Sequence, residues 1–236
     1  MRPRIGVIVQ ARMGSHRLPG KVLRQVAGKP LLAYLLERLR RCEAAAELVV
    51  ATSRQEEDQP VARFCEEGGV ACFRGDLDDV ASRFVAISQD RGLDAFVRLS
   101  GDSPLLDTAL VEERVGCFRA GGFDLATNVF PRTFPTGQSV EVVRCEAYRR
   151  AYARISEAAD REHVTSFLYR HPDEYAITNL AAPEDLTGVR LTVDTPEDLE
   201  RFAALVGRME RPHWQYGLAE VVGLYRQMAP NPEVVR

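Results

Sequence analysis

The sequence lacks a long apolar run, a cysteine framework and an excess of positive charge. Nowhere do about eighteen apolar residues follow one another, so we expect no membrane-spanning helix and no membrane partner. The five cysteines form no C-x-x-C pair and are odd in number, which indicates reduced thiols rather than a disulfide framework or a zinc site. The net charge of −3 argues against a nucleic-acid partner. The apolar run near the N-terminus is too short for a signal peptide, which favours a cytoplasmic protein.

Two standard phosphate-binding fingerprints are also missing. Lys21 is followed by Val22, so the order G-x-x-x-x-G-K-S/T does not occur, and there is no G-x-G-x-x-G. A mononucleotide kinase or a dehydrogenase is therefore disfavoured.

The patterns that are present indicate one α/β domain over residues 1–236. The chain is 45% hydrophobic, long enough for one sizeable core, and has no Pro/Ser-rich linker. Short β-rich runs alternate with helical patterns, which predicts a mostly parallel sheet covered on both faces. We expect strands at 5–9, 48–52, 70–73, 95–99, 123–126, 140–143, 175–178 and 189–193, and helices near 30–42, 59–67, 79–91, 108–120, 145–157, 160–170, 196–206 and 216–228.

The alternation fails after residue 127, where Asn128, Pro131, Pro135 and Gly137 interrupt it. We expect 127–172 to be an insertion over the carboxyl edge of the sheet that binds an acceptor or forms a dimer. A plain connecting loop is the alternative.

Residues 9–21, Val-Gln-Ala-Arg-Met-Gly-Ser-His-Arg-Leu-Pro-Gly-Lys, read as a phosphate-binding loop. The loop lies between an expected strand and a helical leucine pattern, the unit with which α/β proteins hold nucleotides. We expect Gly14 and Gly20 to let backbone N–H groups of the loop point toward phosphate. Arg12 and Lys21 would supply positive charge, and Arg17 would assist them in binding phosphate. The alternative is a solvated turn with ordinary surface cations.

Two aspartates are candidate metal ligands. Asp102 follows the expected strand 95–99, and Asp194 ends the expected strand 189–193. Carboxylates from separate strands that meet at one sheet edge supply the oxygen ligands that Mg²⁺ prefers. Each could instead cap the turn or helix that follows, Asp194 before Thr195 in particular.

These motifs resemble the sugar cytidylyltransferases, the family that activates sialic acid and 3-deoxy-manno-octulosonate, and the opening motif is most similar to its spore coat polysaccharide biosynthesis (SpsF) branch. The resemblance covers roughly residues 4–200. Four further stretches carry it: 73–75 (Phe-Arg-Gly) with 78–80 (Asp-Asp-Val), 98–107 (Arg-Leu-Ser-Gly-Asp-Ser-Pro-Leu-Leu-Asp), 161–165 (Arg-Glu-His-Val-Thr) and 190–199 (Arg-Leu-Thr-Val-Asp-Thr-Pro-Glu-Asp-Leu).

The resemblance implies a Rossmann-like, three-layer α/β/α fold of the nucleotide-diphospho-sugar transferase (GT-A-like) type, with a mostly parallel mixed sheet. It implies a homodimeric, Mg²⁺-dependent enzyme of polysaccharide biosynthesis that transfers CMP from CTP to a sugar, sugar acid or sugar phosphate and releases pyrophosphate.

The resemblance also suggests roles for individual residues. The expected catalytic residues are Arg12, Lys21, Asp102 and Asp194. Of these, the two aspartates are expected to bind the metal. The expected nucleotide contacts are Ala11, Arg12, Gly14, Ser15, Arg17, Lys21, Thr52, Ser53, Asp79, Arg83 and Ser100. For Asp79, simple capping of the following helix is an equal alternative.

The acceptor region departs from the family. Related enzymes tend to read Gly-Leu-Asp-Val-Glu, whereas this chain reads Gly137-Gln138-Ser139-Val140-Glu141 and lacks the first carboxylate. We expect Gln138, Glu141 and His163 to contact an acceptor with a different hydroxyl pattern or more negative charge. His163 could accept the proton of the acceptor or could be structural.

Two other functions compete with this interpretation. A metal-dependent glycosyltransferase that uses a nucleotide sugar often carries a D-x-D pair, and Asp76-Leu77-Asp78 fits that spelling. A non-catalytic nucleotide-binding protein is the other alternative, because a fold alone does not determine function. The presence of Lys21, Asp102 and Asp194 together argues against a pure binder.

Overall fold

The computed structural model describes residues 2–228, and a seven-stranded sheet forms its centre. The strand order is β5-β4-β1-β6-β8-β7-β9. Only β8 runs antiparallel to its neighbours β6 and β7, so the sheet is mixed but mostly parallel, as predicted. The strands are β1 (Ile5–Gln10), β4 (Leu48–Ser53), β5 (Ala71–Gly75), β6 (Ala95–Ser100), β7 (Leu125–Thr127), β8 (Glu141–Arg144) and β9 (Ile177–Asn179).

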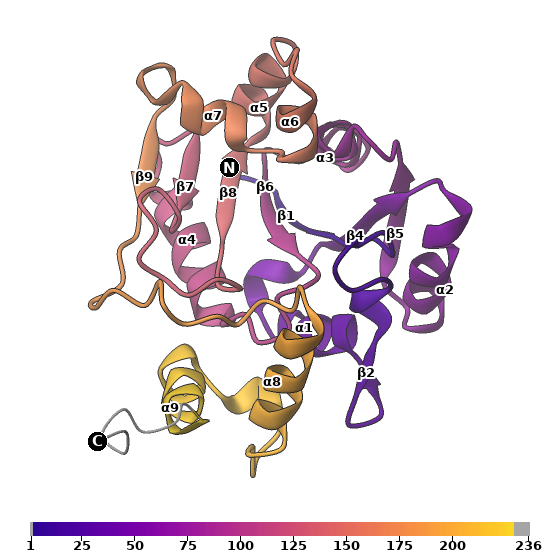
Figure 1. The fold of residues 1–236 in the computed structure, drawn as a ribbon. Helices are drawn as coiled ribbons and strands as arrows, with labels where there is room; N and C mark the ends of the chain where they lie inside the picture. Colours follow the sequence, from indigo (N-terminus) through magenta and orange to yellow (C-terminus); the bar gives the residue numbers. More distant parts are fainter. Residues whose placement is uncertain (1, 229–236) are drawn as a thin grey trace.

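Helices cover both faces of the sheet and complete a three-layer α/β/α fold (Figure 1). One face packs against α1 (Leu31–Leu39), α2 (Gln59–Glu67) and α4 (Thr108–Ala120). The other packs against α3 (Val80–Asp90), α5 (Cys145–Tyr152) and α7 (Ser166–Arg170), with α6 (Ala158–Glu162) beside α3. The Rossmann-like fold class is confirmed.

A third apolar cluster joins the C-terminal helices to α1. The helices α8 (Pro196–Val206) and α9 (Leu218–Met228) pack with Leu31 and Tyr34 of α1. The remaining short elements are the hairpin strands β2 (Gln25–Val26) and β3 (Lys29–Pro30) and the 3-10 helices η1 (Lys21–Leu23), η2 (Glu43–Ala45), η3 (Glu56–Asp58), η4 (Pro172–Glu174) and η5 (His213–Gln215). Within residues 2–228, no helix is both long and apolar enough to cross a membrane.

The side-chain pattern of β6 explains the central position of this strand. Ala95, Val97 and Leu99 join the cluster under α1 and α4, whereas Phe96 packs on the opposite face against Tyr148 of α5. Full burial of each large apolar side chain contributes roughly 1.5–3 kcal/mol, so a strand apolar on both faces is stable only inside the sheet.

Three sequence predictions need correction. Residues 189–193 form no strand, because their one ladder contact is an isolated bridge between Thr136 and Arg190. The expected helix at 145–157 ends at Tyr152, and the one at 160–170 is two short helices. The break between these two contains Val164, whose φ of 24° is incompatible with a continuous helix.

Segment 127–172 is more integral to the sheet than an insertion over its edge. It supplies β8, which lies between β6 and β7, and the helices α5–α7. Because β8 is reversed, the loop 128–140 that precedes it lies at the carboxyl edge of the parallel strands.

Candidate active site

The loop after β1 meets the loop after β6 where the strand order reverses direction. Strands β4 and β5 lie on one side of β1 and β6 on the other, the arrangement that leaves a binding crevice at the carboxyl edge of open α/β sheets. The N–H of Gly101 donates to the carbonyl of Gln10 (2.8 Å), and a Cβ at Gly101 would lie 3.0 Å from the Cβ of Ala11. Glycine at 101 therefore permits the two loops to touch.

The opening loop closes on itself. The N–H of Gly20 donates to the carbonyl of Met13 (2.9 Å), and Gly20 has a φ of 68°, a left-handed conformation that favours glycine. Gly20 directly precedes η1, so the first side chain of η1, Lys21, is delivered to the carboxyl edge. Gly14 has open space around it, and its neighbour Ser15 accepts a long hydrogen bond from Leu18 N (3.4 Å).

Lys21 joins the two predicted metal ligands. Its Nζ lies 2.6 Å from Oδ2 of Asp102 and 2.7 Å from Oδ1 of Asp194. Burial lowers the pKa of Lys21, but the two carboxylates outweigh it and the net effect raises the pKa, so the ammonium stays charged. The structure thus brings together three of the four expected catalytic side chains, which come from residues 21, 102 and 194.

Asp194 reaches this position without a strand. Val193 N donates to the carbonyl of Asp102 (2.9 Å), which couples the two aspartate-bearing segments directly. Thr195, rather than Asp194, caps α8, in a capping box with Asp198. The carboxylate of Asp194 is therefore not used as a cap and instead contacts Lys21 and Arg190 (3.0 Å).

Gly137 explains how the chain before Asp194 is held in place. A Cβ on Gly137 would lie 2.7 Å from the carbonyl carbon of Leu191 and 2.8 Å from the nitrogen of Thr192. Leu191 N donates to the carbonyl of Thr136 (2.9 Å). Sequence reasoning missed this role, although a glycine beside an acceptor motif was a visible signal.

Arg12, the fourth expected catalytic residue, lies apart from this cluster. Its guanidinium forms an ion pair with Glu162 of α6, at 2.7 Å between Nη2 and Oε1. Arg17 is largely exposed and lies 3.5 Å from Asp194. Of these two cations, only Arg17 contacts a member of the Lys21 cluster among the described residues.

The residues expected to face the base have mostly structural partners. Thr52 and Ser53, at the end of β4, are fully buried. The carboxylate of Asp58 accepts from the N–H of Ser53 (3.1 Å) and from the N–H of Met13 (2.6 Å), so it anchors the opening loop to β4. Sequence reasoning missed Asp58, since an acidic Glu-Glu-Asp run looks like a solvated surface. Among the described residues, the buried Thr52 hydroxyl has no hydrogen-bond partner.

Asp79 and Arg83 are also committed within the protein. Asp79 caps α3 by accepting from Ser82 N (2.8 Å) and forms an ion pair with Arg161. Arg83 is buried and donates to the carbonyls of Asp76 (2.7 Å) and Leu77 (2.9 Å). These contacts order the turn before α3, and the structure does not bring either side chain to the Lys21 cluster.

The D-x-D sequence at residues 76–78 lies in the same turn. The carboxylate of Asp76 accepts from the N–H groups of Asp78 and Asp79, each at 2.9 Å. An aspartate carboxylate that accepts hydrogen bonds from backbone N–H groups two and three residues further along the chain is typical of a turn rather than of a metal ligand. This geometry disfavours the glycosyltransferase interpretation.

Ser100 and the expected acceptor residues occupy different environments. Ser100 ends β6, half-buried, two residues before Asp102. Gln138 is fully buried; its amide oxygen accepts from Asp107 N (2.9 Å) and its amide nitrogen donates to the carbonyl of Leu105 (2.9 Å). Its side chain is therefore not presented to an acceptor, contrary to our expectation. His163 is exposed beyond α6.

Glu141 lies in a buried polar network on the α5–α7 face of the sheet. Its carboxylate is 2.5 Å from Arg98 and accepts from the hydroxyls of Thr165 (2.7 Å) and Tyr169 (2.6 Å). Burial and the adjacent Glu141 raise the pKa of Tyr169, so that its hydroxyl remains a donor. Glu141 is thereby held by Arg98, Thr165 and Tyr169.

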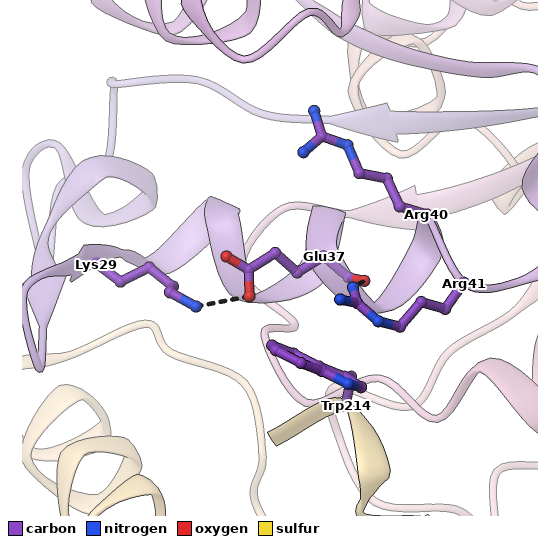
Figure 2. Close-up of a pocket in the computed structure, with 5 residues that line it drawn as sticks. All are labelled: Lys29, Glu37, Arg40, Arg41 and Trp214. Atoms are coloured by element: carbon purple, nitrogen blue, oxygen red, sulfur yellow. Dashed lines mark hydrogen bonds and ion pairs between the residues drawn. The ribbon is translucent and has the colours of Figure 1, made fainter. Parts of the chain in front are cut away.

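A separate hollow of about 550 Å³ lies along α1 (Figure 2). Lys29, Glu37, Arg40, Arg41 and Trp214 line it. Its charges already have protein partners, because Lys29 contacts Glu37 (2.6 Å) and the Arg41 guanidinium stacks 3.8 Å from the Trp214 ring centre. The hollow shares no residue with the Lys21 cluster.

The fold, with the Lys21 cluster at the carboxyl edge of its sheet, is that of the α/β nucleotide-binding class. The cytidylyltransferase family model matches residues 6–220, and the chain belongs to this family. The spore coat polysaccharide biosynthesis protein SpsF of Bacillus subtilis is 36% identical over 214 residues, which cover 87% of this chain and 88% of that protein. The protein is thus a CTP-dependent nucleotidyltransferase of the sugar cytidylyltransferase family, as the motifs indicated.

Solved structures agree with this assignment. A cytidylyltransferase from Leptospira borgpetersenii superposes with a TM-score of 0.91 at 26% identity, covering 95% of this chain and 94% of that one. A CMP:2-keto-3-deoxy-manno-octonic acid synthetase complexed with CTP has a TM-score of 0.65 at 21% identity and covers 87% of this chain and 99% of its own; it supports the fold.

Proposed function

We propose that this protein transfers CMP from CTP to a sugar-type acceptor in a Mg²⁺-dependent reaction and releases pyrophosphate. The observation that carries the proposal is the convergence of Asp102 and Asp194 on one cation, the Lys21 ammonium, beside the glycine-bearing loop. A carboxylate pair and a lysine at a sheet edge are suited to the charge of a triphosphate.

The donor set fits a hard divalent ion. Both carboxylate oxygens lie within 2.7 Å of the same nitrogen, so one cation can contact both. Within the part of the chain that the structure describes, no cluster of three or more His, Cys, Asp or Glu side chains forms a metal cage. Mg²⁺ commonly binds one or two carboxylates together with substrate phosphates and water, and Asp102 and Asp194 would hold it in this way. Bound there, the ion would supply charge neutralisation of the phosphate oxygens.

The protein's own cations would orient the triphosphate. In the reaction a bond forms between an acceptor oxygen and the α-phosphorus, and the bond from that phosphorus to the leaving pyrophosphate breaks. Lys21 and Arg17 both contact Asp194, and Arg12, in the same opening loop, pairs with Glu162. Their positive charges would stabilise the negative charge that the pyrophosphate carries away.

Binding and turnover together test the proposal. We expect CTP with Mg²⁺, but not ATP, GTP or UTP, to raise the melting temperature, since a ligand at a hundred times its Kd adds roughly 2.7 kcal/mol. With a reactive acceptor, Asp102→Asn should lower the rate of pyrophosphate release by about two to four orders of magnitude. Asp78→Asn is the matched control, because Asp78 is exposed and lies outside the cluster.

Each contrary result has a distinct meaning. Full activity of Asp102→Asn would refute the metal assignment. Tight CTP binding without turnover on any acceptor would favour the non-catalytic alternative, and turnover of a nucleotide sugar without pyrophosphate release would favour the glycosyltransferase. The homodimer and the cytoplasmic location stay predictions.

A further inference from the structure

Asp194 lies outside the sheet, so contacts other than strand pairing must fix its carboxylate. Asp102 follows β6 by two residues, whereas the segment before Asp194 joins the structure through an isolated bridge. The Oδ1 atom of Asp194 lies 2.7 Å from Lys21 and 3.5 Å from Arg17. Its other oxygen, Oδ2, lies 3.0 Å from Arg190. The carboxylate therefore divides its contacts, with the opening loop on one oxygen and Arg190 on the other.

Arg190 is anchored by a second carboxylate that is not part of the Lys21 cluster. Its Nε donates to Oδ1 of Asp198 (2.8 Å), and its Nη2 donates to Oδ2 of Asp194 (3.0 Å). One guanidinium thus bridges two carboxylates, which its planar set of donors allows. The side chain of Asp198 is only 3% exposed, so the anchor is itself enclosed by the protein.

Asp198 also holds the backbone of Asp194. Its Oδ2 accepts from the N–H of Asp194 (3.0 Å) and from the N–H of Thr195 (3.1 Å). Thr195 completes a capping box with Asp198 at the start of α8. Asp198 therefore holds the main chain of Asp194 directly and its carboxylate through Arg190. Together these contacts define both the position and the direction of the Asp194 side chain.

We propose that Arg190 is a positioning residue, which holds the carboxylate of Asp194 with one oxygen directed at the divalent ion. The inference rests on the proposed function. Lys21 and Arg17 are the cations that would bind phosphate once CTP is present, whereas Arg190 is tied to Asp198. A carboxylate whose direction is fixed beforehand loses less conformational freedom when it binds an ion.

A plain charge effect of Arg190 would have the opposite sign. Arg190 is a positive charge beside a site for a cation, so its repulsion alone would weaken the binding of a divalent ion. Its side chain is 39% exposed, and solvent and salt screen this repulsion. Removal of Arg190 should therefore weaken metal binding if positioning dominates, and tighten it if charge alone matters.

The experiment uses Mn²⁺ as a spectroscopic probe and needs no acceptor. The Kd of Mn²⁺ is measured by electron paramagnetic resonance at saturating CTP. Arg190→Gln should raise this Kd by about 3- to 10-fold, the range expected when one side chain regains its rotamer freedom. The Kd of CTP measured without metal should stay unchanged. Arg190→Lys, which keeps the charge but loses the planar fork, should recover part of the Mn²⁺ affinity.

Turnover adds a second readout once a reactive acceptor is available. A misplaced catalytic group lowers the rate of the chemical step, so kcat of Arg190→Gln should fall by about 10- to 100-fold. The KM for CTP should change little, because Arg190 contacts carboxylates rather than phosphate.

Arg201→Gln is the matched control. Arg201 donates to the same oxygen of Asp198 as Arg190 does (2.7 Å) and is exposed to a similar extent (31%). Within residues 2–228 it forms no hydrogen bond or ion pair with Asp194. Each variant loses an ion pair with Asp198, so each should lower the melting temperature without ligand slightly. Arg201→Gln should nevertheless keep the Mn²⁺ affinity and the kcat of the wild type.

Two results would overturn the proposal. One is Mn²⁺ binding by Arg190→Gln that equals or exceeds that of the wild type. The other is an equal loss of affinity in Arg201→Gln, which would assign the effect to Asp198 and the start of α8. Failure of the proposed function has a different signature, because the wild type itself would then bind no Mn²⁺ in the presence of CTP, or Asp102→Asn would bind it as tightly as the wild type.

Discussion

Replacing Gly137 by alanine should displace Asp194 from Lys21, although residues 137 and 194 are far apart in sequence. Gly137 has a φ of 91°, and its added Cβ would meet backbone atoms of Leu191 and Thr192 at 2.7–2.9 Å. Those atoms belong to the segment that leads into Asp194, so the collision cannot be relieved by turning a side chain.

The magnitude follows from two contributions. A non-glycine residue with positive φ costs of order 1–3 kcal/mol, and overpacking against backbone adds a similar amount. We therefore expect about 2–6 kcal/mol of destabilisation, which for a chain of this length lowers the melting temperature by roughly 4–24 °C. A shift of about 1 Å in a catalytic group can reduce turnover 100-fold, so pyrophosphate release should fall by about that factor.

Gly188→Ala is the matched control. Gly188 lies in the same segment, has no positive φ, and a Cβ there would meet no atom within 4 Å. Its melting temperature and activity should stay near those of the wild type. Wild-type stability and turnover in Gly137→Ala would refute the idea that loop 136–137 positions Asp194.

Three other perturbations test separate parts of the site. Lys21→Met leaves Asp102 and Asp194 without their shared cation. In the absence of metal, this variant should have a lower melting temperature than the wild type, and Mg²⁺ should raise its melting temperature by more than it raises that of the wild type. An unchanged response to Mg²⁺ would count against a shared metal site. Glu162→Gln removes the ion pair of Arg12, which is partly exposed, and titration calorimetry should show CTP binding up to about fivefold tighter; unchanged affinity would show that Arg12 does not bind phosphate. The pKa of Asp198 is lowered to about 2: burial opposes this shift, but hydrogen bonds from Arg190, the N–H of Asp194 and Arg201 outweigh burial. The ionised Asp198 therefore stabilises the folded protein fully above the unfolded-state pKa of 3.8, and this stabilisation is lost as the pH falls toward 2. Between pH 5 and pH 2 the wild type should therefore lose about 2 kcal/mol more than Asp198→Asn in denaturant titrations, and equal losses would contradict this assignment.

Much of the fold and the centre of the site could be predicted from local sequence. The run before residue 10, the glycines and cations up to Lys21, and the leucines of α1 indicate strand, loop and helix through neighbouring residues alone. Asp102 was identified for the same reason, since it follows a strand whose apolar pattern is evident. The position of Asp194 was anticipated by its motif, but for the wrong structural reason, because an apolar run such as 189–193 reads as a strand whether or not a partner strand is present.

The remaining features depend on contacts between distant residues. Asp58 anchors Met13, 45 residues away, and Gln138 bonds to Asp107, 31 residues away, so neither role leaves a local pattern. The sequence by itself determined the family, the mostly parallel sheet and the charged groups that are candidates for the site. Only the tertiary structure decided which charges are paired. Arg98 forms an ion pair with Glu141, whereas Arg132 has no acidic partner among the described residues. The sequence does not show this difference, because the pairing of charges depends on their distance in space rather than along the chain.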